Sequence, residues 1–311
     1  MLSIKDKGPS PYPAMDHIVI SPAGVYKLLT GLKVHKATGP DKIPTRLLKT
    51  LAEELTPVFS LFFQASLDQS IVPEDWKTAD VVPVFKKGGR EKAENYRPIS
   101  LTSVSCKLLE HVVCSSIMKH FDKNSVLNDA QHGFRGRRSC TTQLILTIQD
   151  LAKGVDNREQ VDVILLDFSK AFDRVPHMRL LHKLKYYGVT NNTHGWISDF
   201  LGGRTQRVLL EGVSSELLPV TSGVPQGSVL GPLLFLAFIN DLPDVVSPRS
   251  TVRLFADDCV LYRKVKSKED AAELQRDLDG LQQWEADWQM EFHPKKCQVL
   301  HVTNKKKCHQ G

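Results

Sequence analysis

Apolar positions along the chain follow two spacings, one typical of helices and one typical of buried strands. Leucine and phenylalanine recur at helical spacing over residues 44–70, which predicts one long packing helix. The stretch over residues 79–85, apolar apart from Asp80, and the continuous apolar run over residues 163–166 instead predict strands. The run 163–166 lacks polar alternation, as expected for a strand covered on both faces. Further helices are expected over residues 21–32, 104–121, 140–151, 176–187, 193–201, 229–241 and 268–290, and further strands over residues 206–210 and 217–220. Residues 1–20 are rich in proline and are expected to be loosely ordered.

Two adjacent carboxylates, Asp257 and Asp258, lie between two apolar runs in the stretch 253–262. Each run predicts a short strand, so the pair is expected at the tip of a hairpin. Neighbouring carboxylates repel each other, and burying either one without a counter-charge is costly. A bound divalent cation such as Mg²⁺ would offset both the repulsion and the cost of burial. The alternative is an ordinary turn, because aspartate favours turns and two residues alone do not decide between them.

A third carboxylate, Asp167, ends the apolar run 163–166 abruptly. A carboxylate at the end of a buried strand is a common way to bring a metal ligand to a cleft, although a cap for the next segment is an equal alternative. Phe172 follows five residues later and could point back toward whatever Asp167 holds.

Basic residues near predicted helix starts suggest contacts with phosphates. Arg97 and Lys107 flank the start of the helix expected over residues 104–121, where a guanidinium and an ammonium could grip a triphosphate. The basic turn 86–90 could also hold phosphates, but a solvated hairpin is the better interpretation of its composition.

Loop 131–139 is the densest basic segment of the chain. Its aromatic residue could stack on a base while its arginines follow a nucleic-acid backbone, and a solvated loop is the alternative. The residues concerned are Phe134, Arg135, Arg137 and Arg138.

A loop rich in glycine and proline over residues 222–232 leads into the helix expected over residues 229–241. Gly227 lets the backbone approach a substrate closely, and Gln226 offers both hydrogen-bond donors and an acceptor. Taken alone, this loop is a weak signal that also fits a plain helix start.

Composition and charge set limits on these interpretations. The 311 residues are enough for two or three packed subdomains, and a hydrophobic content of 41% is ordinary for a soluble globular protein. A net charge of +6 permits a nucleic-acid partner without establishing one. Six cysteines without a Cys-x-x-Cys pair predict neither a disulfide framework nor a zinc site, which favours a reducing compartment, cytoplasmic or nuclear. The first residues lack the apolar core of a signal peptide, and no apolar run is long enough to span a bilayer.

Taken in order, five segments closely resemble the reverse transcriptase domain of non-long-terminal-repeat retrotransposons, especially the jockey-like branch. The resemblance covers residues 67–302, and the upstream residues 37–41 match as well. The five segments are residues 95–101, 131–135, 166–173, 223–232 and 255–258.

The resemblance implies an α+β fold, a right-hand polymerase with fingers over residues 67–160 and a palm over residues 161–311. The palm would be an antiparallel sheet backed by helices, and residues 1–66 would form an N-terminal extension with helices. Such elements usually encode an endonuclease upstream and a thumb downstream. We therefore expect an absent or truncated thumb, a weak grip on primer and template, and poor processivity.

The resemblance also implies roles for individual residues. Asp167, Asp257 and Asp258 would hold two Mg²⁺ ions, with the carbonyl of Phe168 nearby, and Lys296 would be a candidate general acid near the pyrophosphate. In the same segment, His293 and Cys297 depart from the asparagine and threonine common in the family. Phe172 would exclude a 2′-hydroxyl, Arg97 and Lys107 would grip the triphosphate, and Gln226 and Gly227 would contact nucleotide and template.

The partners implied are an RNA template, a DNA primer and deoxynucleoside triphosphates. Two other hypotheses stay open at this point. One is a catalytically inactive relic or co-opted RNA-binding protein that keeps the basic loop. The other is an RNA-dependent RNA polymerase, against which Phe172 argues.

Overall fold

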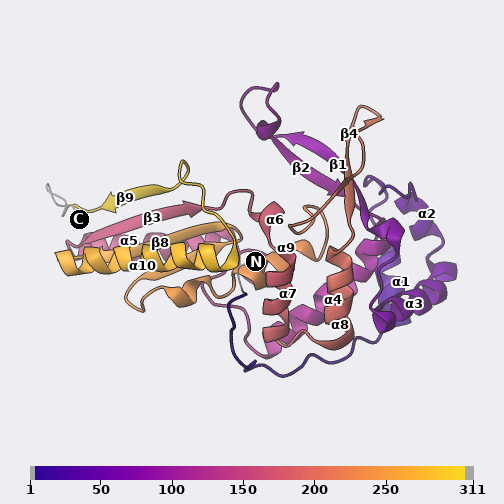
Figure 1. Cartoon of the computed structure of the whole chain (residues 1–311), viewed down its shortest axis with the longest axis horizontal. Coiled ribbons are helices and arrows are strands. Elements are labelled where there is room, and N and C mark those ends of the chain that lie inside the picture. The colour runs from indigo at the N-terminus through magenta and orange to yellow at the C-terminus, as the bar shows by residue number, and fades with distance from the viewer. Residues whose placement is uncertain (1–3, 305–311) are drawn as a thin grey trace. The chain divides into compact units, whose positions relative to one another are not determined.

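The computed structural model describes residues 4–304, which form two compact units (Figure 1). Unit 1 comprises residues 125–179 and 235–304 with residues 4–7, and unit 2 comprises residues 8–124 and 180–234. The limits of the two units differ from the expected boundaries of the extension, fingers and palm, which fall after residues 66 and 160. Those boundaries remain a prediction. The lysine-rich end of the chain, residues 305–311, lies outside the described part.

Unit 1 is built on a four-stranded sheet with the order β7-β8-β3-β9, and every pair in it is antiparallel. The apolar strand β3 lies in the interior of the sheet, which explains its continuous run of buried residues. The strands are β3 Gln160–Asp167, β7 Thr251–Phe255, β8 Asp258–Val265 and β9 Gln298–Val302. The predicted strand, the predicted hairpin and the expected antiparallel sheet backed by helices are confirmed.

Helices α5, Cys140–Asp156, and α10, Lys268–Trp288, cover opposite faces of this sheet. Side chains alternate along a strand, so neighbours point to opposite faces. Tyr262 of β8 packs with Val163 and with Leu151 of α5, whereas the adjacent Arg263 contacts α10. Both helices begin as the sequence indicates, because Ser139 forms a capping box with Thr142 and Ser267 caps α10. Two shorter helices complete unit 1, α6 Ala171–Arg174 and the 3₁₀ helix η3 Leu242–Val245.

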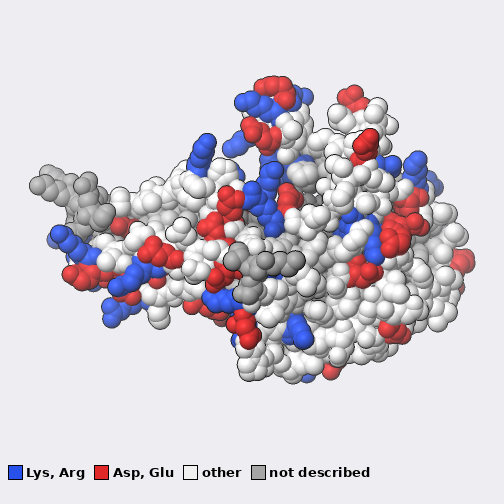
Figure 2. Space-filling view, in the orientation of Figure 1, with Lys and Arg blue, Asp and Glu red and all other residues white. Residues whose placement is uncertain are grey.

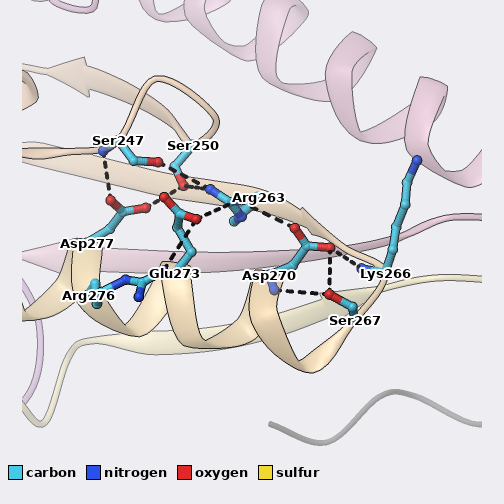
Figure 3. Close-up of polar contacts among 9 residues, drawn as sticks. All are labelled: Ser247, Ser250, Arg263, Lys266, Ser267, Asp270, Glu273, Arg276 and Asp277. Atoms are coloured by element: carbon cyan, nitrogen blue, oxygen red, sulfur yellow. Dashed lines mark hydrogen bonds and ion pairs between the residues drawn. The ribbon is translucent and has the colours of Figure 1, made fainter.

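A buried polar network ties the loop after η3 to α10 (Figure 3). Asp277 of α10 is only 3% exposed and accepts hydrogen bonds from the backbone N–H of Ser247 and from the hydroxyl of Ser250. Arg263 of β8, also 3% exposed, contacts both serine hydroxyls and forms an ion pair with Glu273 of α10. The network therefore joins loop, sheet and helix through groups that have lost most of their contact with water.

Replacing Asp277 by Ala is expected to lower the free energy of unfolding by about 2–4 kcal/mol, because it leaves buried donors unpaired beside Arg263. Urea titrations followed by circular dichroism measure this change. Asp279→Ala on the exposed side of the same helix is the control and should stay within about 0.5 kcal/mol. An equal effect of the two substitutions would mean that the network contributes nothing beyond helix propensity.

A second polar cluster joins α5 to the β7–β8 hairpin. The carboxylate of Asp150 accepts hydrogen bonds from the Tyr262 hydroxyl at 2.6 Å and from Arg253 at 2.8 Å. Partial burial acts to raise the pKa of Asp150, but these two hydrogen bonds, together with the charges of Arg253 and Lys153, hold the pKa below its usual value. Burial and the bond to Asp150 raise the pKa of Tyr262 to about 12. The cluster thus stabilises the fold with Asp150 ionised.

The stabilising effect of Asp150 should depend on pH in one direction. Its pKa is lower in the folded than in the unfolded chain, so the contribution is complete above the unfolded value of about 3.9 and is lost as the pH falls further. We expect Asp150→Asn to cost up to about 1 kcal/mol at pH 7 and much less near pH 3. Urea midpoints of both proteins across this range test the prediction, and a gap that widens toward acid would contradict it.

Unit 2 contains a mixed sheet in which β1 pairs antiparallel with β2 and parallel with β4, while β4 also pairs with β5 and β6. The strands expected over residues 206–210 and 217–220 are confirmed, and they pair antiparallel as β4 and β6. The strands are β1 Thr78–Phe85, β2 Tyr96–Leu101, β4 Thr205–Leu210, β5 Val213–Ser214 and β6 Leu218–Pro219. The helices are α1 Pro22–Thr30, α2 Thr45–Thr50, α3 Ala52–Gln69, α4 Val104–Lys123, α8 Asn191–Leu201, and the 3₁₀ helices η1 Glu74–Trp76 and η2 Ala93–Asn95. Two helices, α7 His177–Tyr186 and α9 Gly231–Ile239, run across the limits of the units.

Two expectations for unit 2 are wrong. The single helix expected over residues 44–70 is interrupted at Leu51, whose backbone leaves the helical region and separates α2 from α3. Residues 8–20, which precede α1 in unit 2, are not loose, since Met15, Ile18 and Ile20 are buried and the Met15 N–H donates to the Gly188 carbonyl at 2.7 Å. Apolar residues scattered among prolines were enough to anchor an extended segment without any periodic pattern.

Two further observations concern membrane-spanning helices and disulfides. Among the helices of residues 4–304, none is long and apolar enough to cross a membrane. The cysteines described in the structure, Cys106, Cys114, Cys140, Cys259 and Cys297, are all free thiols.

Candidate active site

Strand register brings two of the candidate carboxylates to the same end of the unit 1 sheet. Asp167, the last residue of β3, pairs directly with Asp258, the first residue of β8. Asp258 also pairs with Phe255 across the β7–β8 hairpin, so Ala256 and Asp257 form its two-residue tip. Ala256 has a φ of 53°, in the left-handed region that residues other than glycine adopt rarely. Three carboxylates from two distant segments are therefore neighbours.

The electrostatics of this end of the sheet reflect crowding of like charges. Asp258 reaches solvent, yet the surrounding protein removes part of its hydration, and this loss raises the pKa of its carboxyl. Repulsion from Asp257 and Asp167 raises that pKa further, while Lys296 acts in the opposite direction. Such a cluster is stabilised by any cation that approaches it.

Lys296 supplies a positive charge at this site, with its ammonium 2.6 Å from a carboxylate oxygen of Asp167. The segment before it is bonded to the end of β3, because the His293 N–H donates to the Asp167 carbonyl and the Ser169 N–H donates to the Glu291 carbonyl, both at 2.7 Å. Within residues 4–304, no group of three or more acidic, histidine or cysteine side chains is arranged to hold a metal ion. The carboxylates thus adjoin one another, and Lys296 is an ion-pair partner of Asp167.

Two phenylalanines follow Asp167 and have different surroundings. Phe168 is 2% exposed and stacks on Phe292 with ring centroids 4.4 Å apart, so its side chain belongs to the core. Phe172 stacks on Phe235 at 4.6 Å and meets the edge of Phe134 at 6.4 Å. Phe172 is half-buried and its ring is held from two sides.

The basic loop of unit 1 is partly engaged in its own fold. Arg135 and Arg138 both form ion pairs with Asp129, and Arg138 also donates to the Gln131 carbonyl. Phe134 and Arg137 are exposed and have positive φ angles of 52° and 62°. The loop therefore projects one aromatic and one basic side chain while its other two arginines shape its base.

The remaining candidates lie in unit 2. The Ser100 N–H of β2 donates to the Gln226 carbonyl at 2.7 Å, which brings the 95–101 and 223–232 segments together. Gly227 has a φ of 115°, and a Cβ there would lie 2.6 Å from the Ser100 carbonyl oxygen, so only glycine fits. Arg97 is exposed on β2.

Lys107 lies in the first turn of α4. Burial lowers its pKa, Glu110 opposes that effect, and Lys36 adds to it. Lys107 thus lies at the start of α4 between an acidic neighbour, Glu110, and a basic one, Lys36.

The charged loop between β1 and β2 is solvated. Figure 2 shows basic and acidic side chains gathered together at this loop, whose residues 86–94 include four basic and two acidic side chains, nearly all exposed. The solvated alternative for the turn 86–90 fits this mixture of charges.

Two residues that sequence reasoning did not single out support these segments. Glu110 is fully buried and accepts the backbone N–H groups of Val229 and Leu230, at 2.7 and 2.9 Å, just before α9. Gln131 is 2% exposed and bonds to Ala256 at the hairpin tip. Glu110 could have been noticed as a glutamate on the apolar face of a predicted helix. Gln131 gave no such signal, because it lies in a loop that was noted only for its basic residues.

Comparison with known proteins adds an independent finding. A family model described as "Reverse transcriptase (RNA-dependent DNA polymerase)" matches residues 84–309. The RNA-directed DNA polymerase from the mobile element jockey of Drosophila melanogaster is 30% identical over 90% of this chain and 31% of its own length. A probable RNA-directed DNA polymerase from transposon BS of the same species is 31% identical over 91% and 32%. Another from transposon X-element is 30% identical over 92% and 32%, so the chain spans about a third of the length of these curated relatives.

Proposed function

Because the chain belongs to the reverse transcriptase (RNA-dependent DNA polymerase) family, we propose that it catalyses RNA-templated addition of deoxynucleotides to a primer 3′-hydroxyl. It is a reverse transcriptase domain of the kind found in non-long-terminal-repeat retrotransposons, with an α+β fold. In this proposal, the fingers lie in residues 67–160, and the palm begins at residue 161 and includes the carboxylate-bearing strands β3 and β8. The observation that carries it is the register that sets Asp167 opposite Asp258 beside a hairpin tip that holds Asp257.

The chemistry of the acidic cluster supports a metal-binding role. Reverse transcriptases generally use divalent metals, and carboxylate oxygens are the ligands that Mg²⁺ prefers. Asp167, Asp257 and Asp258 would hold two ions, and their mutual repulsion is what bound cations would relieve. When bound, such a pair activates the attacking hydroxyl and stabilises charge on the transferred phosphoryl group.

The protein's own groups would position substrates and move one proton. The new bond joins the primer 3′-oxygen, whose proton passes to solvent, to the α-phosphorus, and the bond from that phosphorus to the pyrophosphate oxygen breaks. Lys296, tied to the end of β3 through the 291–293 segment, would donate a proton to the leaving pyrophosphate. Phe172, held by Phe235, would face the sugar and leave no room for a 2′-hydroxyl.

Residues of unit 2 and of the basic loop would bind the other parts of the substrates. Arg97 and Lys107 would contact the triphosphate, while Gln226 and Gly227 would contact the nucleotide and template. Phe134 and Arg137 would contact the RNA template by stacking and by charge, with Arg135 and Arg138 holding their loop in place.

Incorporation of radiolabelled dTTP on a poly(rA)·oligo(dT) primer-template tests this proposal. We expect incorporation that needs Mg²⁺ or Mn²⁺ and stops on addition of a chelator. To separate weak binding from absent chemistry, the assay is repeated with the chain fused to the downstream segment of the jockey polymerase. No incorporation by either folded protein would overturn the proposal and favour a catalytically inactive RNA-binding protein.

A further inference from the structure

We propose that Gln131 is a positioning residue that fixes the hairpin tip carrying Asp257 and Asp258. This inference rests on the proposed function for its consequence in catalysis, but its structural part stands by itself. The segment concerned, residues 130–133, belongs to unit 1 along with the hairpin, although more than a hundred residues separate the two in sequence.

The carboxamide of Gln131 bonds to both backbone groups of one residue. Its oxygen accepts from the Ala256 N–H at 2.9 Å, and its nitrogen donates to the Ala256 carbonyl at 3.3 Å. The same oxygen accepts from the Gly133 N–H at 2.7 Å. Because the side chain is only 2% exposed, water does not readily replace these bonds.

Backbone contacts on both sides of Gln131 fix its approach to β7. The Leu254 N–H donates to the Ala130 carbonyl at 2.9 Å, and the His132 N–H donates to the Leu254 carbonyl at 2.8 Å, so the segment forms a short parallel bridge. Gly133 then passes so close to the tip that a Cβ there would lie 2.3 Å from the Ala256 nitrogen. Only glycine at position 133 therefore allows the hairpin to pack this closely against the segment.

The hairpin tip needs such support for two physical reasons. Ala256 has a positive φ, a strained conformation that persists only where the surroundings enforce it. The carboxylates of Asp257 and Asp258 also repel each other, which favours opening of the tip. Glutamine can hold both backbone groups of the strained Ala256, because its carboxamide offers a donor and an acceptor side by side. It also adds no further negative charge beside the two aspartates.

Replacing Gln131 by Met keeps the side-chain volume and removes the hydrogen bonds. We expect the Ala256 amide hydrogen to exchange with solvent about 10- to 100-fold faster in the metal-free protein. Incorporation by the fused polymerase should fall by a similar factor in kcat with the KM for dTTP within about threefold, since substrate-binding groups are unchanged. The matched control is Gln160→Met, a fully buried glutamine at the opposite end of β3 that bonds to Asp162.

A rescue experiment distinguishes positioning from general stability. Glycine adopts a positive φ without strain, so Ala256→Gly in the Gln131→Met background should recover part of kcat. Unchanged exchange at Ala256 in Gln131→Met, or equal kinetic effects of Gln131→Met and Gln160→Met without rescue, would overturn the inference. If the wild-type chain shows no incorporation, amide exchange alone decides the positioning claim, so its failure is distinct from failure of the proposed function.

Discussion

Replacing Asp257 by Asn is expected to reduce deoxynucleotide incorporation at least about 1,000-fold, because the neutral amide is a poor ligand for a divalent cation that must stabilise phosphoryl charge. The same loss is expected for Asp258→Asn and Asp167→Asn. Each substitution keeps the shape of the side chain, and none of the three carboxylates is buried, so the fold should be retained. Single-turnover incorporation with the fused polymerase measures the loss over this range.

The control for these substitutions is Asp279→Asn on the exposed side of α10, which should leave incorporation unchanged. Retention of labelled RNA on filters should also be unchanged in all variants, because the basic loop is intact. Activity within tenfold of wild type in Asp257→Asn would remove this residue from the metal site. Parallel loss of RNA retention would point to a folding defect instead.

Replacing Phe172 by Val should relax the choice between deoxynucleotides and ribonucleotides by about 10- to 100-fold, measured as the ratio of kcat/KM for dTTP and UTP. The physical reason is the support of this ring: Phe235 stacks behind it and Phe134 meets its edge, so the side chain has little freedom to move away from a 2′-hydroxyl. Valine shortens the side chain and opens that space. The gain should appear mainly in the use of UTP.

Phe85→Val is the matched control for this substitution, since Phe85 is a partly exposed phenylalanine on β1 of unit 2. Its sugar selectivity should equal that of wild type. If Phe172→Val lowered the use of both nucleotides by the same factor, Phe172 would be a packing residue without a part in sugar selection. The RNA polymerase hypothesis would then regain support.

Much of the fold followed from local patterns, because the forces that form these elements are local. An uninterrupted apolar run predicts an interior strand, and the observed β3 is one. Ser139 and Ser267 stand where capping residues belong, and the helices begin there. The pairing of Asp167 with Asp258 agrees with a strand end and a hairpin tip that share one sheet.

Features that depend on contacts between distant segments could not be predicted in the same way. Nothing in the local pattern marks Leu51 as a break between two helices, and nothing in residues 1–20 reveals the bond from Met15 to Gly188. Gln131 is an ordinary polar residue in sequence and gains its importance only when Ala256 lies beside it. The ion pair of Lys296 with Asp167 likewise depends on the return of the chain along β9.

Anomalous diffraction from crystals of the chain with primer-template, an unreactive dTTP analogue and Mn²⁺ tests the central claim most directly. We predict anomalous peaks about 2.2 Å from carboxylate oxygens of Asp167 and of the Asp257–Asp258 tip, with the Lys296 ammonium displaced from Asp167. Peaks only elsewhere, with the 2.6 Å contact between Lys296 and Asp167 retained, would contradict a shared metal site.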